Sequence, residues 1–345
     1  MKLKGQKQVL NPYDPQTPAK PEYFGGRQQI LKSVRERIDI AKTYRKSGGI
    51  LIYGHRGVGK TSLLKKIIDE AGGFEDNPAN ALIIYRRLGR TTTEEELYGM
   101  VTEEAVTGVQ RRKSFIERMA AKSKNVSGIR LFEIGIDFSR DAPNISNYQK
   151  WKLILQNLRN VDYVLIALDD TDYLSTEAIG ELKTIAEDVQ NVPVLLVVSG
   201  GVEFEEKLVG NYSPVARIFS GASFNITQFS LEETREVLTK PLTGENTKWK
   251  ESAILELQKF TAGFPYLVQC LAKASYIESG TIDENKVRDS VNLAVEIGRS
   301  WLAHVIPTAS DRDVVSFMKI ADLKRDIIQS VEMSDLGISA PYIGR

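Results

Sequence analysis

The sequence predicts an α/β fold, a three-layer sandwich in which helices cover both faces of a mainly parallel sheet. Two observations lead to this prediction. Short apolar runs of strand length alternate with segments of helical periodicity as far as residue 230, as expected when helices join parallel strands. From Leu231 onward the strand signal stops while helical periodicity continues. We therefore expect an α/β domain followed by a small all-helical domain.

The chain begins with a segment that we expect to form an extended arm. Residues 1–22 contain little apolar material and several prolines, which disfavour helix. Residues 28–43 follow with apolar side chains at spacings of three and four, which predicts a helix. These apolar side chains belong to Ile30, Leu31, Val34 and Ile38.

The remaining elements follow from the same periodicities. The expected strands lie at residues 49–53, 81–85, 161–168, 192–198 and 224–229. The expected helices of the α/β domain lie at residues 61–71, 93–110 and 176–189. Those of the helical domain lie at residues 231–239, 251–261, 265–277 and 284–297. The chain is thereby divided into an arm (1–22), an α/β domain (23–230), a helical domain (231–305) and a C-terminal segment (306–345).

Size and composition are those of an ordinary globular protein. A length of 345 residues suggests two or three domains. The chain has 46 Lys plus Arg and 45 Asp plus Glu, so binding to nucleic acid or a membrane surface would need a local patch. Because Cys270 is the only cysteine, an intrachain disulfide and a cysteine-rich metal site are excluded. The polar N-terminus and the short apolar runs predict no secretory signal and no membrane span, so we expect a cytoplasmic protein.

Residues 54–61, GHRGVGKT, match the G-x-x-x-x-G-K-[ST] pattern of a phosphate-binding loop, or P-loop. The match lies directly after the apolar run ILIY and directly before the helical pattern TSLLKKIIDEA, which is the context that the pattern requires. Its glycines allow backbone amides to point inward around a phosphate at the positive end of the helix. Lys60 is expected to reach the β- and γ-phosphates of ATP, and the hydroxyl of Thr61 to bind Mg²⁺.

The other loop residues are expected to contribute backbone. His55 and Arg56 occupy positions that the pattern leaves free, so no side-chain chemistry is assigned to them. The residues expected around the phosphates are Gly54, His55, Arg56, Gly57, Val58, Gly59, Lys60, Thr61 and Ser62.

A second motif is an apolar run that ends in acids, YVLIALDDTDYL at residues 163–174. Asp169, at the end of this expected strand, is the predicted partner of Thr61 in holding Mg²⁺. Asp170 is the candidate to orient the attacking water. Asp172 is either a further polar site residue or an acid at the start of a helix.

Together these motifs resemble the AAA+/STAND group of P-loop ATPases, in particular the archaeal- and bacterial-type ATPases akin to origin-recognition initiators. The resemblance covers roughly residues 20–300 and extends through the helical domain, which corresponds to the group's lid. It implies ATP and Mg²⁺ as cofactors and hydrolysis of ATP to ADP and phosphate.

The resemblance assigns further site residues. Phe24 and Arg27, in PEYFGGRQQI, would lie against the adenine. Ser199, at the end of VPVLLVVSGG, would sense the γ-phosphate, unless it only caps a strand. Arg217, in SPVARIFS, stands where the group can carry an arginine finger or sensor, or is a surface arginine. Pro265, in TAGFPYLVQCLAKA, would lie at the edge of the nucleotide.

Two departures from the group's pattern favour a slow ATP-gated switch over a fast motor. Initiator-type members usually carry a sensor arginine in the lid, and no arginine closely follows Pro265. The acidic pair is Asp169–Asp170, where many P-loop ATPases have Asp-Glu. The expected catalytic residues are Lys60, Asp170, Ser199 and Arg217.

The partner is left open among three alternatives. Two features are typical of a DNA-binding initiator, loader or transposition-type regulator. One is a basic segment at residues 111–130, and the other is a C-terminal segment (306–345) with the sequence pattern of a truncated winged helix-turn-helix. The same basic segment is also compatible with a solvated helix or a protein partner, as in a signalling or scaffold ATPase. If Arg217 acts across a subunit boundary, an ATP-dependent homo-oligomer follows. The basic residues are Arg111, Arg112, Lys113, Arg118, Lys122, Lys124 and Arg130.

Overall fold

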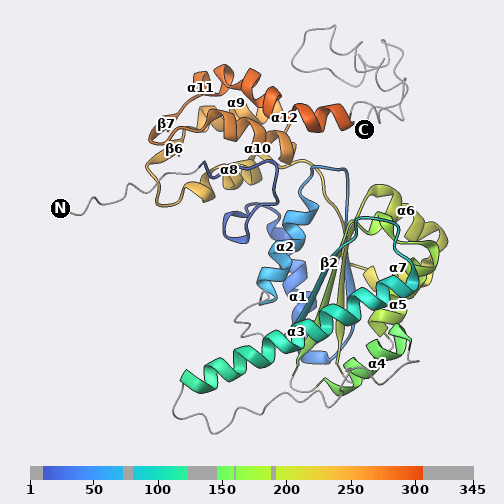
Figure 1. Ribbon diagram of the computed structural model, residues 1–345. Coiled ribbons are helices and arrows are strands. Elements are labelled where there is room, and N and C mark those ends of the chain that lie inside the picture. Colours follow the sequence, from blue (N-terminus) through green and yellow to red (C-terminus); the bar gives the residue numbers. More distant parts are fainter. Residues whose placement is uncertain (1–10, 73–80, 123–145, 159–160, 188–191, 306–345) are drawn as a thin grey trace.

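A computed structural model describes residues 11–72, 81–122, 146–158, 161–187 and 192–305 of the chain. Figure 1 shows a larger domain built on a sheet and a smaller, mostly helical domain next to it. The strands of the larger domain lie in the order β2-β3-β4-β1-β5 and are all paired in parallel. Their bounds are Gly48–Tyr53 (β1), Ala81–Arg87 (β2), Tyr163–Asp169 (β3), Val194–Gly200 (β4) and Ser223–Asn225 (β5).

The central strands β3 and β4 are apolar except near their carboxyl ends, because both of their faces are covered. Every residue of β3 and β4 is buried, and a strand in that position needs apolar side chains at each step. The parallel register places Ile52 of β1 beside Ser199 of β4, and Leu168 of β3 beside Val198. The carboxyl ends of β1, β3 and β4 therefore meet at one edge of the sheet.

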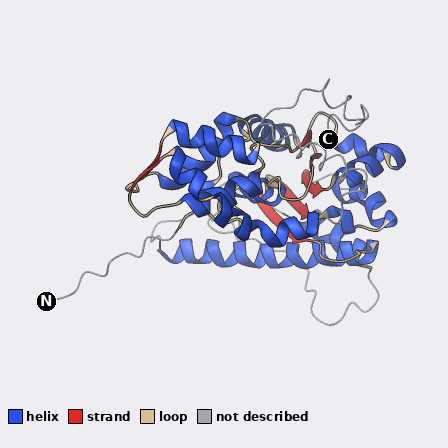
Figure 2. Ribbon diagram, turned by 90° about the horizontal axis from the view of Figure 1, so that it is seen from above, coloured by secondary structure: helices blue, strands red, loops and turns tan. Residues whose placement is uncertain are grey.

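Helices cover both faces of the sheet, which confirms the three-layer sandwich (Figure 2). On one face, α1 and α2 pack against the sheet through side chains such as Val34 and Ile67. On the other face lie α3, α4 and α5, with buried side chains such as Val101 and Leu182. The helices of this domain are α1 (Gln28–Tyr44), α2 (Lys60–Glu70), α3 (Glu94–Lys122), α4 (Asn147–Asn157), α5 (Thr176–Glu187), α6 (Val202–Asn211) and α7 (Ser213–Ala216). Short 3-10 turns are η1 (Pro21–Tyr23), η2 (Thr171–Tyr173) and η3 (Arg217–Phe219).

The smaller domain is not all-helical, so that part of the prediction is wrong. Two short strands, β6 (Thr247–Trp249) and β7 (Gly280–Ile282), pair in parallel between its helices. A run of three residues is too short for alternation to be told from a loop in the sequence. The helices of this domain are α8 (Leu231–Thr239), α9 (Glu251–Thr261), α10 (Pro265–Ser275), α11 (Glu284–Asp289) and α12 (Val291–Val305), with the 3-10 turn η4 (Lys240–Leu242).

Several boundaries differ from those expected from the sequence. The helix expected at residues 284–297 is broken at Ser290, whose hydroxyl donates to the carbonyl of Lys286. The strand expected at residues 224–229 is β5 and ends at Asn225, after which the chain crosses to the smaller domain. The helix expected at residues 93–110 is α3, which continues to Lys122. The winged helix-turn-helix expected at residues 306–345 lies outside the described residues.

The arm expected at residues 1–22 is non-helical over residues 11–20, as its prolines predict, but it is not solvated along its length. Tyr13 is buried in the core of the smaller domain. Its hydroxyl accepts a hydrogen bond from the indole N–H of Trp249 at 2.8 Å and donates one to the carbonyl of Leu238. Burial raises the pKa of Tyr13, so the hydroxyl keeps its proton. The arm is therefore a structural part of the smaller domain.

We expect Tyr13→Phe to lower the free energy of unfolding by about 1–3 kcal/mol, because it removes two buried hydrogen bonds and leaves the indole N–H of Trp249 without this acceptor. Denaturant titration of the parent and the variant measures the change. Tyr44, which is 68% exposed, provides the control Tyr44→Phe, for which we expect no loss. Equal stability of Tyr13→Phe and the parent would show that the arm does not hold the smaller domain together.

Among the described residues, no helix combines the length and the apolar content needed to cross a membrane.

Candidate nucleotide-binding site

The phosphate-binding loop connects β1 to α2 and has the backbone that its glycines were expected to allow. Gly54, Gly57 and Gly59 all have positive φ angles, of 149°, 89° and 93°. At Gly54 a β-carbon would also lie 2.4 Å from the carbonyl oxygen of Ile226, so no other residue fits there. The loop therefore takes the wrapped conformation, and its last residues lead into the N-terminus of α2, where backbone amides attract anions.

Lys60 reaches back across this loop. Its ammonium donates to the carbonyl of Gly54 at 2.8 Å and to that of His55 at 3.0 Å. Burial lowers the pKa of Lys60, while the nearby carboxylates of Asp172, Asp170 and Asp169 act in the opposite direction. Neutral carbonyls are weaker acceptors for an ammonium than phosphate oxygens, so a triphosphate in the loop can take over this side chain.

Asp169 and Ser199 form a buried polar cluster beside the start of α2. Both residues are fully buried, and the carboxylate Oδ2 of Asp169 and the hydroxyl of Ser199 have no hydrogen-bond partner among the described residues. Burial raises the pKa of Asp169, and the nearby hydroxyls of Thr61 and Ser199 oppose that shift. An unpaired buried carboxylate oxygen next to a threonine hydroxyl is the donor set that Mg²⁺ prefers, so these residues fit the ion.

The carboxylate of Asp170 pairs with an arginine of the neighbouring strand β2. Asp170 has a left-handed backbone, with φ of 57°, and its carboxylate forms an ion pair with Arg87 at 2.7 Å. Arg87 is the last residue of β2 and lies beside Asp169 in the sheet register. Arg87 was not expected at the site from the sequence, although two arginines end the apolar run ALIIYRR. Any action of Asp170 on water must therefore compete with this ion pair.

Asp172 lies in the first turn of η2 and binds the end of the neighbouring strand. Both of its carboxylate oxygens accept from the backbone N–H of Gly201, at 2.9 and 2.8 Å. Its neighbour Thr171 donates to the carbonyl of Ser199 at 3.0 Å. These contacts tie the end of β3 to the end of β4 and to the start of α6.

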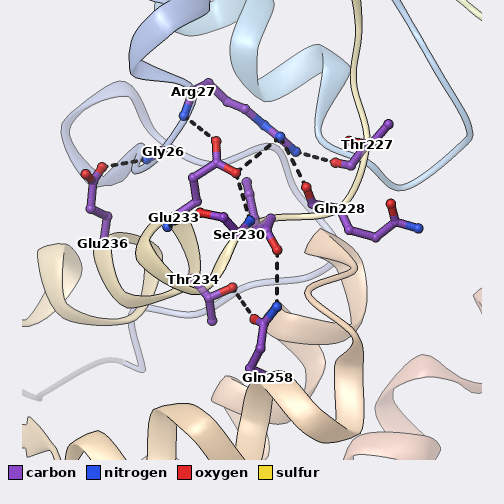
Figure 3. Close-up of polar contacts among 10 residues, drawn as sticks. Gly26, Arg27, Thr227, Gln228, Ser230, Glu233, Thr234, Glu236 and Gln258 are labelled. Atoms are coloured by element: carbon purple, nitrogen blue, oxygen red, sulfur yellow. Dashed lines mark hydrogen bonds and ion pairs between the residues drawn. The ribbon is translucent and has the colours of Figure 1, made fainter. Parts of the chain in front are cut away.

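Arg27 does not point its guanidinium into the loop but toward the segment that connects the two domains, residues 226–230 (Figure 3). It donates to the carbonyls of Thr227 and Gln228 and stacks on the ring of Phe229 at 4.6 Å. It also approaches the carboxylate of Glu233 at 3.5 Å, and its backbone N–H donates to the same carboxylate at 2.8 Å. Burial lowers the pKa of Arg27, and Glu233 opposes the shift.

Glu233 joins this contact to the start of the smaller domain (Figure 3). It completes a capping box with Ser230, in which each side chain bonds to the other's backbone N–H. The next residue, Thr234, donates to Gln258, which in turn donates to the carbonyl of Phe229. The segment 226–230 is thus held from both domains.

The remaining predicted site residues do not form one cluster. Phe24 is buried in the core formed by α1, α2 and the sheet, and Pro265 is buried at the first position of α10. His55 and Arg56 are exposed, whereas Val58 is core. The hydroxyl of Ser62 accepts from the backbone N–H of Ala19, and Arg217 is exposed at the start of η3.

Two aromatic side chains of the smaller domain lie against the phosphate-binding loop. This contact was not expected from the sequence. A β-carbon on Gly57 would lie 3.1 Å from a ring carbon of Phe264 and 3.1 Å from the indole nitrogen of Trp301. The two rings are themselves 5.2 Å apart. The phosphate-binding loop therefore lies at the junction of the two domains.

Comparisons with known proteins agree with this geometry. The model of a family described as AAA ATPase domain matches residues 23–198. The fold is similar to that of the Aeropyrum pernix ORC2 protein, solved in ADPNP–ADP complexes, with a TM-score of 0.56 and 13% identity over 90% of this chain and 78% of that one. It is also similar to Cdc6p from Pyrobaculum aerophilum, with a TM-score of 0.50 and 13% identity over 76% of this chain and 63% of that one. None of the curated proteins compared with the chain matches it.

Proposed function

Because this chain belongs to the AAA ATPase domain family, we propose that it binds ATP with Mg²⁺ at residues 54–61 and works as a slowly hydrolysing, nucleotide-dependent conformational switch. The three-layer AAA+ P-loop fold agrees with the family, and the complexes of the similar Aeropyrum pernix ORC2 protein contain nucleotide.

One observation carries the switch role: the smaller domain contacts the phosphate-binding loop directly. Phe264 and Trp301 lie on Gly57, and the carbonyl of Gly263 accepts from the N–H of Phe229 in the connecting segment at 2.8 Å. A change in the loop therefore alters contacts to the smaller domain, which is the requirement for a ligand to shift a two-state equilibrium.

The site residues have separate roles in this proposal. Lys60 and the loop amides bind the β- and γ-phosphates, and Thr61 and Asp169 hold Mg²⁺, which neutralises charge on the phosphates when bound. Asp170 orients the attacking water, and Ser199 contacts the γ-phosphate. The ion pair between Asp170 and Arg87 competes with the orientation of water by Asp170, which supports slow turnover.

Amide hydrogen exchange in the nucleotide-free, ADP-bound and ATP-bound protein tests the switch. We expect exchange in the connecting segment 226–230 and at the start of α10 to slow with ATP and to recover with ADP. Identical exchange in all three states, in a protein that binds ATP, would leave an ATP-binding protein without a switch.

Arg217 is exposed at the start of η3, and its action across a subunit boundary is one of the roles left open for it. In that case a slowly hydrolysed ATP analogue promotes self-association, and Arg217→Ala lowers turnover about tenfold or more without changing nucleotide affinity. Light scattering measures the assembly. Exposed Lys207 on α6 gives the control Lys207→Ala, with unchanged turnover. A monomer at every concentration with the analogue present would contradict this role.

A second candidate function, ATP-dependent DNA binding, is favoured by α3. This single helix continues past the buried side chain of Val109 and extends away from the rest of the domain (Figure 1). Its last part carries Arg111, Arg112, Lys113, Arg118 and Lys122 against Glu117. Lys124 and Arg130, the rest of the basic segment, lie outside the described residues. Clustered cations on one segment are the electrostatic signature of phosphate-backbone binding.

Reversal of Arg111, Arg112 and Lys113 to Glu tests this candidate. We expect DNA affinity to fall by a similar factor on every sequence and its salt dependence to flatten, with ATP affinity unchanged. DNA titrations at two salt concentrations, with ATP present, measure both.

The matched control reverses three exposed cations elsewhere, Lys32, Lys46 and Lys207, which changes the net charge by the same amount. Absence of DNA binding by the parent would reject this candidate and favour a signalling or scaffold ATPase with protein partners.

A further inference from the structure

Trp301 is a residue of the smaller domain with an unusual position. It lies on α12, where its ring stacks on Tyr266 with 4.9 Å between centroids and an angle of 28°, and is tilted against Phe264 at 5.2 Å. Both neighbours belong to the start of α10, beside which α12 packs (Figure 1). The ring is therefore held by aromatic packing on the side of the smaller domain.

The indole N–H of Trp301 is buried and has no acceptor among the described residues. Such a group on its own does not indicate a ligand, because the N–H of Trp151 in the core of the larger domain is also unpaired. The difference lies in the surroundings. Trp151 is enclosed by apolar side chains, whereas the N–H edge of Trp301 lies at the phosphate-binding loop.

The contact with the loop is specific to that edge of the ring. A β-carbon on Gly57 would lie 3.1 Å from the indole nitrogen and 3.3 Å from the adjacent ring carbon. Gly57 has a φ of 89°, so the loop turns there in a conformation that favours glycine, and the indole occupies the space that a side chain would need. A donor without an acceptor is thus fixed beside a loop whose own donors bind phosphate.

We propose that Trp301 is a nucleotide-binding residue, whose indole N–H donates a hydrogen bond to a phosphate oxygen of the nucleotide held by residues 54–61. This inference rests on the proposed ATP binding and adds to it a contact that comes from the smaller domain. An anionic phosphate oxygen is a strong acceptor, and leaving a buried donor unpaired is unfavourable, so the contact has a reason to form. Through it the position of α12 depends on whether a nucleotide is bound.

The test compares ATP affinity in Trp301→Phe and in the parent by calorimetric titration with Mg²⁺ present. Phenylalanine keeps an aromatic ring against Tyr266 and Phe264 but has no N–H. We expect affinity to fall about tenfold, which corresponds to about 1.4 kcal/mol. The matched control is Trp151→Phe, which removes an equally unpaired indole N–H away from the loop and should leave ATP affinity unchanged.

A second measurement observes ATP binding in the parent and uses the variant only to assign a resonance. The chain has three tryptophans, so its proton–nitrogen NMR spectrum contains three indole resonances. We expect ATP to shift one of them downfield, and that resonance to be the one missing in Trp301→Phe. ATP binding by the parent, with Trp301→Phe within twofold of it and no indole resonance moving, would overturn the inference and leave the proposed function intact. A parent that does not bind ATP would overturn both.

Discussion

Replacement of Lys60 by Ala is expected to lower ATP affinity by about a hundredfold or more, which is about 2.7 kcal/mol at the lower limit. The side chain is the ammonium of the phosphate-binding loop, and its present acceptors are only the carbonyls of Gly54 and His55. Removing it deletes the positive charge that faces the β- and γ-phosphates. Calorimetric or fluorescence titration with ATP and Mg²⁺ measures the loss.

The control for this experiment is another lysine of the same helix. Lys66 bonds to Asp69 on the surface of α2, so Lys66→Ala should leave ATP affinity unchanged. If Lys60→Ala bound ATP as tightly as the parent, the nucleotide would have to bind elsewhere, and the assignment of residues 54–61 would be wrong.

Replacement of Asp170 by Asn is expected to slow ATP hydrolysis by about a hundredfold while ATP affinity stays within a few fold. The carboxylate acts on the attacking water rather than on the nucleotide, so its loss affects turnover. Asparagine has nearly the same shape but cannot accept a proton. Phosphate release under saturating ATP measures the turnover, and a titration measures the affinity.

Asp172 provides the matched control, because it is an acid two residues further on with a different task. In Asp172→Asn the remaining carbonyl oxygen can still accept from the N–H of Gly201, so we expect turnover to stay within a few fold of the parent. Equal turnover in Asp170→Asn and the parent would remove Asp170 from catalysis. A large loss in Asp172→Asn would instead make Asp172 the group that acts on water.

The parts of the site that the sequence predicted are those fixed by local chain geometry. Residues 54–61 follow a strand and begin a helix, and the pattern itself demands the positive φ angles that Gly54 and Gly59 adopt. Asp169 ends a strand, and parallel strands bring their carboxyl ends to one edge of a sheet, so its meeting with Ser199 followed from the strand assignments.

The parts that the sequence did not predict depend on contacts between distant segments. The pairing of Arg87 with Asp170 depends on β2 lying next to β3, and strand order cannot be read from the strands alone. Arg27 matched a motif for adenine contact, but its guanidinium donates hydrogen bonds to the carbonyls of Thr227 and Gln228. Trp301 reaches the loop only through the packing of α12 on α10, for which no local pattern exists.

The most direct test of this account is an experimental structure of the chain with Mg²⁺ and a slowly hydrolysed ATP analogue. We expect the triphosphate inside residues 54–61, with the ammonium of Lys60 within hydrogen-bond distance of a phosphate oxygen and the metal between Thr61 and Asp169. An analogue bound elsewhere on the chain, with the carbonyls of Gly54 and His55 still holding Lys60, would contradict it.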